Sequence, residues 1–214
     1  ATSSTINVGS LMIAPTANPT LDAAITTSAS FLPLRSVVLK ASTTNTMGTL
    51  ANVSGNILEI PATTKVTVSS KLNNAGTLRL HSDDNSSAQL KQDGASYTQS
   101  GKVMLRKEFK AAKGWYFISF PYNVNLSDIK LAGTETTATT ENLTTDTEPY
   151  ADFYVIEYNG QRRDATGTAT VTNSPNWDVV TSGTLQAGKG YAIMVMSDKS
   201  LDFVSATSAT GMFD

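Results

Sequence analysis

The chain has 214 residues, of which 40% are hydrophobic and 16% are charged, and its formal net charge is −2. This length suits one large all-β domain or two smaller ones. The near-neutral balance, without any Lys/Arg-rich run, argues against a nucleic-acid partner. With no Cys and a single His, the sequence also argues against zinc and copper sites.

The composition favours a particular cellular setting. No apolar run approaches the roughly 18 residues of a membrane-spanning helix, and no signal peptide is recognisable. The chain begins with "ATSSTIN" rather than Met, so we expect a mature form, a trimmed form or a piece of a longer protein. Low charge, abundant Thr, Ser and Asn, and no Cys favour an extracellular or cell-surface bacterial protein.

The first 50 residues hold short apolar runs that are interrupted by Pro15, Pro19 and Pro33. Proline cannot donate to a strand ladder, so these runs are predicted to be edge strands or strand ends. The segment 35–41, "RSVVLKA", is the firmest strand here. The best helical candidate, residues 21–29, is short. We treat residues 1–50 as an irregular or β N-terminal segment.

Residues 51–109 contain short runs such as "NILEI", "KVTVSSKL" and "GTLRL", which alternate apolar with polar residues. This period of two predicts strands with one buried face. The runs are separated by turn-forming residues, as in "NNAG" at 73–76. Their spacing suits a meander or a partial β-solenoid, although no strict repeat is visible.

Residues 110–214 form an aromatic-rich segment that we predict to be a β-sandwich or jelly-roll-like domain. In "KGWYFISFPYNV" both faces of the strand carry large apolar groups, which predicts burial on both sides and a core role for Trp115 and Phe117. The segment 133–148 has almost no large apolar residue and is predicted to be an exposed loop. The predicted strands are 114–121, 152–158, 169–172, 177–180, 190–196 and 200–204.

The order of motifs "GWYFISFPYNV", "YVIEYNGQRRD", "NWDVV" and "LQAGKGYAIMV" resembles an all-β module of secreted and surface proteins of Bacteroidetes-type bacteria. The preceding "ILEIPATTKVTVSSKLNNAGTLRLHSDDNSSAQL" resembles the coils that often come before this module. The resemblance covers about residues 50–204. It implies a secreted or cell-surface all-β protein, usually part of a longer chain, and it carries no catalytic residues to transfer.

Catalytic and metal-binding candidates are few. His81 follows "TLRL" and is expected to lie on the surface beside a turn. Asp83, Asp84 and Asn85 offer the hard oxygen ligands that calcium takes, but their spacing is not that of an EF-hand. The alternative is a solvated turn between strands, so calcium is left open and no other cofactor is predicted. No nucleophile elbow is present, and the chain is predicted not to be an enzyme.

Ligand-binding candidates are exposed aromatic residues and their polar neighbours. Trp177, Tyr158 and Arg162 are the residues selected, with core burial as the alternative for Trp177. The Asn-Gly of "YNGQRRD" predicts a β-hairpin. The leading functional hypothesis is a non-catalytic structural or adhesive module whose partner is an extracellular glycan or a surface protein. The alternatives are a carbohydrate-binding module and a pilus-like subunit that assembles by strand exchange.

Overall fold

The computed structural model describes residues 4–14, 19–94, 96–166 and 176–206. It confirms the all-β prediction, with 53% of residues in strands and 6% in helices. The chain forms two compact units: unit 1 comprises residues 1–107 and 202–214, and unit 2 comprises residues 108–201. The boundaries predicted at residues 50 and 109 stay a prediction. The predicted strand at 169–172 lies outside the described residues.

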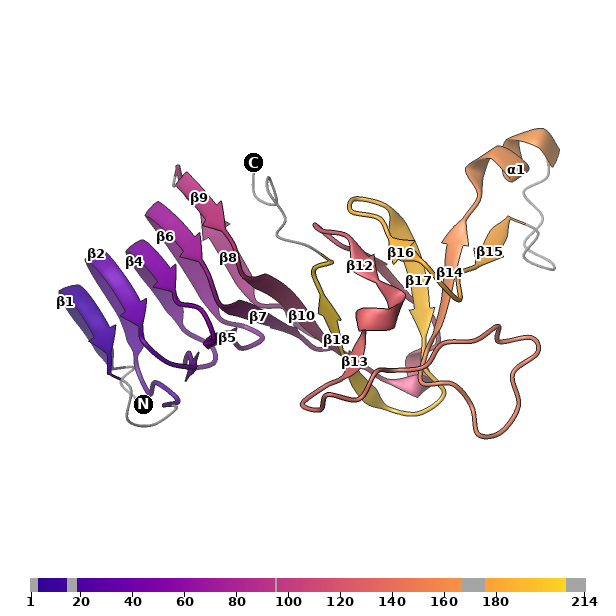
Figure 1. The fold of residues 1–214 in the computed structure, drawn as a ribbon, viewed down its shortest axis with the longest axis horizontal. Helices are drawn as coiled ribbons and strands as arrows, with labels where there is room; N and C mark the ends of the chain where they lie inside the picture. Colours follow the sequence, from indigo (N-terminus) through magenta and orange to yellow (C-terminus); the bar gives the residue numbers. More distant parts are fainter. Residues whose placement is uncertain (1–3, 15–18, 95, 167–175, 207–214) are drawn as a thin grey trace. The chain divides into compact units, whose positions relative to one another are not determined.

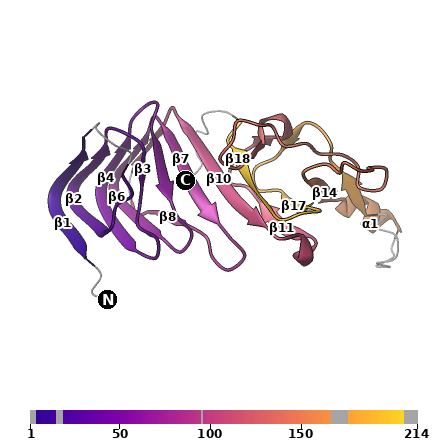
Figure 2. The same cartoon turned by 90° about the horizontal axis from the view of Figure 1, so that it is seen from below.

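Unit 1 is a parallel β-solenoid, so of the two alternatives for residues 51–109 the solenoid is the one observed (Figures 1 and 2). From β2 to β8, successive strands alternate between two sheets. The partners in each parallel pair lie 19 to 25 positions apart along the chain. The first sheet contains β1 (Thr5–Ile13), β2 (Ala24–Pro33), β4 (Thr44–Asn52), β6 (Lys65–Asn74), β8 (Gln89–Gln92) and β9 (Ser96–Gln99). The second contains β3 (Val37–Val38), β5 (Ile57–Ile60), β7 (Thr77–Ser82) and β10 (Lys102–Phe109), with β18 (Lys199–Val204) next to β10.

The interior of the solenoid is built from side chains stacked in register. Phe31, Leu50 and Leu72 occupy equivalent positions on β2, β4 and β6, and all three are fully buried. One position is polar in two successive coils: Asn52 and Asn74 are in register, and Asn52 Nδ2 donates to Asn74 Oδ1 at 2.9 Å. Each amide also donates to a backbone carbonyl of a later strand. Buried amides are stable here because they satisfy the backbone groups at the corner of the coil.

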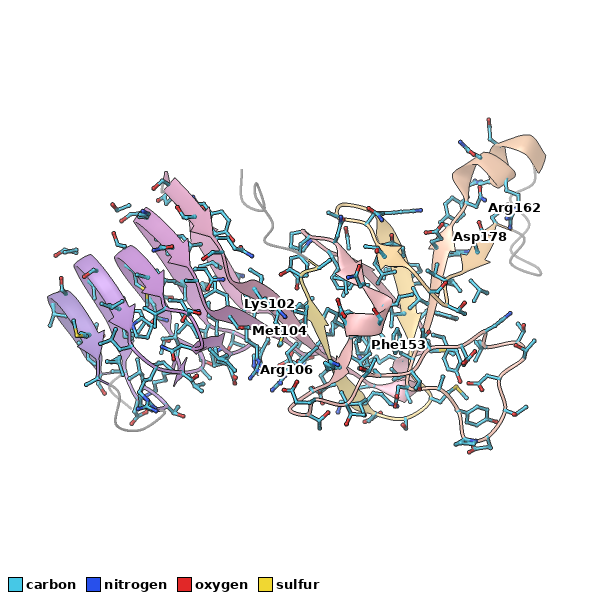
Figure 3. All side chains as sticks on the ribbon, in the orientation of Figure 1. Lys102, Met104, Arg106, Phe153, Arg162 and Asp178 are labelled. Carbon is cyan, nitrogen blue, oxygen red and sulfur yellow. The ribbon has the colours of Figure 1, made fainter. Side chains whose placement is uncertain are left out.

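Unit 2 contains a four-stranded antiparallel sheet in the order β11-β17-β14-β15, together with a two-stranded sheet of β12 and β16. Its fully buried side chains include Phe120, Phe153, Val155 and Ile193; Figure 3 labels Phe153. The strands of unit 2 are β11 (Tyr116–Ser119), β12 (Val124–Asn125), β13 (Lys130–Leu131), β14 (Tyr154–Tyr158), β15 (Trp177–Val179), β16 (Thr184–Leu185) and β17 (Gly190–Met194). The helical segments are η1 (Ala111–Lys113), η2 (Leu126–Asp128) and α1 (Gly160–Thr166).

The structure decides three local predictions. Residues 21–29 are not helical, since β2 begins at Ala24. The Asn-Gly sequence does not form a hairpin, because α1 begins at Gly160. The segment 133–148 is largely exposed, as predicted, but it is held to the rest of unit 2: Ala138 is buried and the hydroxyl of Tyr154 donates to Asp146 at 2.7 Å.

The outer face of the second sheet in unit 1 carries a group of charged side chains centred on Glu59. His81 Nε2 lies 3.1 Å from Glu59 Oε1, and Arg79 Nη1 donates to Glu59 Oε2 at 2.8 Å. The contact with His81 and then that with Arg79 lower the pKa of Glu59 to about 2, against the opposing effect of partial burial. The ionised form of Glu59 therefore stabilises the folded state.

Because of this group, we expect the unfolding free energy of unit 1 to decrease at acidic pH. Because the folded-state pKa of Glu59 lies below its value of 4.5 in the unfolded chain, its contribution is complete above about pH 4.5 and declines as the pH falls toward 2. We expect the difference in unfolding free energy between the wild type and Glu59→Gln to shrink over this interval. Urea unfolding at a series of pH values measures it. A difference that stays constant down to about pH 2.5 would contradict the prediction.

Candidate binding face

The four-stranded sheet of unit 2 presents three aromatic side chains on one face. Phe117 comes from β11, Tyr158 from the end of β14 and Trp177 from the start of β15, where it lies directly opposite Tyr158. The rings of Tyr158 and Trp177 meet edge to face with centroids 5.2 Å apart. The ring of Phe117 lies 6.1 Å from that of Trp177. We call this cluster the aromatic face.

Strand register explains how three strands bring these rings together. Ser119 pairs with Gly190, and the β14–β17 register, in which Tyr154 pairs with Met194, aligns Tyr158 with the same position. Ser119, Gly190, Tyr158 and Trp177 thus form one row across the sheet. Because Gly190 has no side chain, this row has room above its centre, where the ring of Trp177 approaches that of Phe117 in the adjacent row.

The exposure of these aromatic side chains shows that they are not part of a buried core. The side chain of Phe117 is 78% exposed and that of Tyr158 is 39% exposed, whereas Trp177 is half-buried. The predicted core role is therefore wrong for Phe117, and Trp115 is only half-buried. Phe117 lies on β11, the edge strand of this sheet, opposite Ala192 of β17. Ala192 is buried, whereas the ring of Phe117 is left in solvent.

A hollow of about 400 Å³ lies on the aromatic face. Its floor is Ser119 and Gly190, and its sides are formed by the three aromatic rings. The complete lining is Phe117, Ile118, Ser119, Tyr158, Trp177, Gly190 and Tyr191. None of these lining residues carries a charged side chain, so recognition here must come from ring stacking and neutral hydrogen-bonding groups.

Charged side chains occupy the reverse face of the same strands. Glu157 and Asp178 each adjoin an aromatic residue in sequence, and successive side chains of a strand point to opposite faces. Glu157 accepts from Lys189 Nζ at 2.7 Å, and this bond raises the pKa of Lys189. Asp178 pairs with Arg162 Nη2 at 2.5 Å (Figure 3). Bonds from Asn159 and then from Arg162 lower the pKa of Asp178.

Arg162 therefore lies near the aromatic face without lining its hollow. It belongs to α1, which begins here because Asn159 acts as a cap: Asn159 Oδ1 accepts the backbone N–H of Arg162 at 2.9 Å. The same asparagine donates its amide to Asp178 Oδ2 at 2.8 Å. Asn159 thus fixes α1 against β15, and Arg163 donates to the hydroxyl of Tyr158 at 3.2 Å, which orients that phenol.

A second hollow in unit 2, of about 450 Å³, offers a different chemistry. Its lining is mostly small hydroxyl-bearing and backbone groups, and no aromatic ring borders it. The lining residues are Asn125, Leu126, Ser127, Ala138, Thr139, Thr140, Glu141, Thr181, Ser182, Gly183 and Thr184. Without a large apolar surface to bury, this hollow is the weaker candidate for a ligand site.

The residues considered for calcium lie in a turn after β7. Asp83 Oδ1 accepts the backbone N–H groups of Asn85 and Ser86, both at 2.7 Å, and these bonds lower the pKa of Asp83. One carboxylate oxygen of Asp83 is thus already used to close the turn. Within the described part of the chain, no three His, Cys, Asp or Glu side chains gather as a metal site would require. Calcium binding by Asp83, Asp84 and Asn85 stays a prediction.

Comparisons with protein families, with curated proteins and with solved structures found no match for this chain. Among the described residues, no helix is long and apolar enough to cross a membrane. The function is therefore inferred from the aromatic face itself. The sequence selected Tyr158 and Trp177 but missed Phe117, Ser119 and Gly190. The only signal for Phe117 was its large ring on a strand with apolar residues on both faces.

Proposed function

We propose that this chain is a non-catalytic module of a secreted or cell-surface bacterial protein that binds carbohydrate on its aromatic face. The observation that carries the proposal is the exposure of Phe117 beside Tyr158 and Trp177 on one face of a four-stranded sheet. An exposed apolar patch of this kind marks a binding surface in a stable protein. The sequence resemblance to secreted Bacteroidetes-type modules supports the extracellular setting.

The chemistry of sugar rings matches this surface. One face of a pyranose presents C–H groups, which pack against the electron-rich face of an aromatic ring, while its hydroxyl groups stay in water or bond to neighbouring polar groups. Tyrosine and tryptophan suit this role because each joins a large apolar body to a hydrogen-bonding group. Ser119 adds a hydroxyl to the hollow. Nothing in such a site needs to transfer a proton, which agrees with a non-catalytic role.

Substituting Phe117 tests this function directly. Because the ring is 78% exposed, Phe117→Ala should change the unfolding free energy by only about 0.5 kcal/mol. Loss of a stacking contact of about 1–3 kcal/mol, by analogy with base stacking, should weaken polysaccharide binding roughly tenfold or more. Affinity electrophoresis in gels containing soluble polysaccharides measures retention, and thermal melting checks the fold.

Tyr150→Ala is the matched control, since Tyr150 is an aromatic residue of unit 2 that is 45% exposed and does not line the hollow. It should be retained like the wild type. Trp177→Ala should lose binding as Phe117→Ala does. Equal retention of the wild type and Phe117→Ala, or no retention of the wild type by any polysaccharide in a broad panel, would end the proposal.

A second candidate is an adhesive module that binds a surface protein or a pilus-like partner by strand addition. It is favoured by β1, which has nine residues, none charged, and which among the described strands pairs with β2 alone. An uncharged strand at the edge of a sheet is a template for another strand. Under this alternative the partner would be a protein, and Phe117→Ala would bind it as the wild type does.

A further inference from the structure

We propose that the aromatic face selects an uncharged polysaccharide and discriminates against acidic ones. This inference rests on the proposed function and names its ligand class. The distribution of charge in the outer part of the sheet supports it: the hollow is lined by neutral groups, and the charged residues that adjoin its rings in sequence are directed to the reverse face and are paired there.

The pairing determines which charges a ligand meets. Lys189 is bonded to Glu157, with its ammonium group also 5.9 Å from the ring centroid of Tyr191. Arg162 is bonded to Asp178, which also accepts from Asn159. Arg163 does not line the hollow and donates to the hydroxyl of Tyr158. A carboxylate or sulfate placed in the hollow would lose water without gaining a cation among the lining residues, and burying such a charge unpaired is unfavourable.

The polar groups that remain in the hollow are matched to hydroxyl groups. The hydroxyl of Tyr158 already accepts a bond from Arg163, so its proton is available to a ligand oxygen. Together with the hydroxyl of Ser119, this group offers neutral donors and acceptors at the edges of a stacked sugar ring.

Gly190 identifies the space that the sugar would fill. A Cβ atom built on Gly190 would meet no atom of the protein within 4 Å. The backbone of Gly190 is not in the left-handed region, so a larger residue can be accepted without strain. A side chain at this position would therefore extend from the floor of the hollow and occupy the volume proposed for the ligand.

The first experiment compares polymers that share a backbone and differ chiefly in charge. Hydroxyethyl cellulose against carboxymethyl cellulose, and fully methyl-esterified against de-esterified homogalacturonan, are suitable pairs for titration with the full chain. We expect the neutral member of any pair that binds to bind at least tenfold more tightly. We also expect its affinity to change less than about twofold between low and high salt, because no ionic contact is screened.

Two variants connect this selectivity to the hollow. Gly190→Val should abolish binding of the neutral polymer without lowering the melting temperature, while the control Gly9→Val, at another glycine with open space around it, should bind normally. Ser119→Lys adds a cation to the floor and should raise affinity for the acidic member of the pair. Normal binding by Gly190→Val would show that the hollow is not the site.

The outcomes separate the function from the selectivity. If no polymer binds, or if Phe117→Ala binds like the wild type, the proposed function fails. If an acidic polymer binds more tightly than its neutral partner and this binding is lost in Phe117→Ala, the function stands and the selectivity proposed here is wrong. Neutral preference that is lost in Gly190→Val supports both.

Discussion

Replacing Arg106 by Met should destabilise unit 1 by about 3–5 kcal/mol, because it leaves the carboxylate of Asp202 buried without its cation. Arg106 on β10 (Figure 3) donates from Nε and Nη2 to the two oxygens of Asp202 on β18, both at 2.7 Å. Asp202 is only 3% exposed. The bond to Asp202 raises the pKa of Arg106, so the guanidinium keeps its charge.

The matched control removes both charges. A buried ion pair can be replaced by apolar residues with little loss of stability, whereas removing one partner is costly. We therefore expect Arg106→Met/Asp202→Leu to recover most of the stability that Arg106→Met loses. Urea unfolding followed by circular dichroism measures the three proteins. If the unfolding free energy of Arg106→Met lies within about 1 kcal/mol of the wild-type value, this ion pair contributes no more to stability than an exposed ion pair does.

The sequence was most informative where the signal is local. Alternation of apolar and polar residues, bounded by turn-forming residues, located strands that the structure confirms, including β5, β6 and β7. Each strand needs only its own residues to show this period. The same alternation arises in parallel and antiparallel sheets, so it could not distinguish a solenoid from a meander.

The solenoid repeat was hidden because its coils differ in length and content. Partner positions are separated by 19 to 25 residues, so no single period aligns the whole unit. The residue type at equivalent positions of successive coils also changes. Pro33 on β2 is followed by Asn52 on β4 and then by Asn74 on β6. Packing inside the coil requires complementary volume rather than identical residues.

The aromatic face was misjudged because burial is decided by distant elements. Large apolar residues on both sides of β11 correctly indicate a strand, but which part of it is covered depends on β17 and on the elements that pack over it. For the Asn-Gly pair, the residues that follow decide whether a hairpin or a helix forms. A hairpin requires a returning strand after two residues, whereas Asn159 here caps a short helix that carries Arg162 to Asp178.

The stacking of the solenoid leads to a second prediction with a large expected effect. A Cβ atom on Gly101 would lie 1.9 Å from the carbonyl oxygen of Gly76, its neighbour in the preceding coil, and 2.6 Å from the backbone carbon of Ala75. Where side chains can yield, overpacking costs about 1–3 kcal/mol. Here the contact is with backbone, so the cost of Gly101→Ala should exceed about 3 kcal/mol. The two glycines allow adjacent coils to approach closely where the chain turns into β7 and β10.

The experiment can report on the two units separately, because both tryptophans lie in unit 2. In Gly101→Ala, thermal melting followed by circular dichroism should show early loss of strand structure from unit 1, while tryptophan emission follows unit 2. Gly9→Ala is the control, since Gly9 is also in the solenoid and a Cβ there meets nothing within 4 Å; it should melt like the wild type. If Gly101→Ala also melts like the wild type, the coils are not packed as closely at this corner as the structure has them.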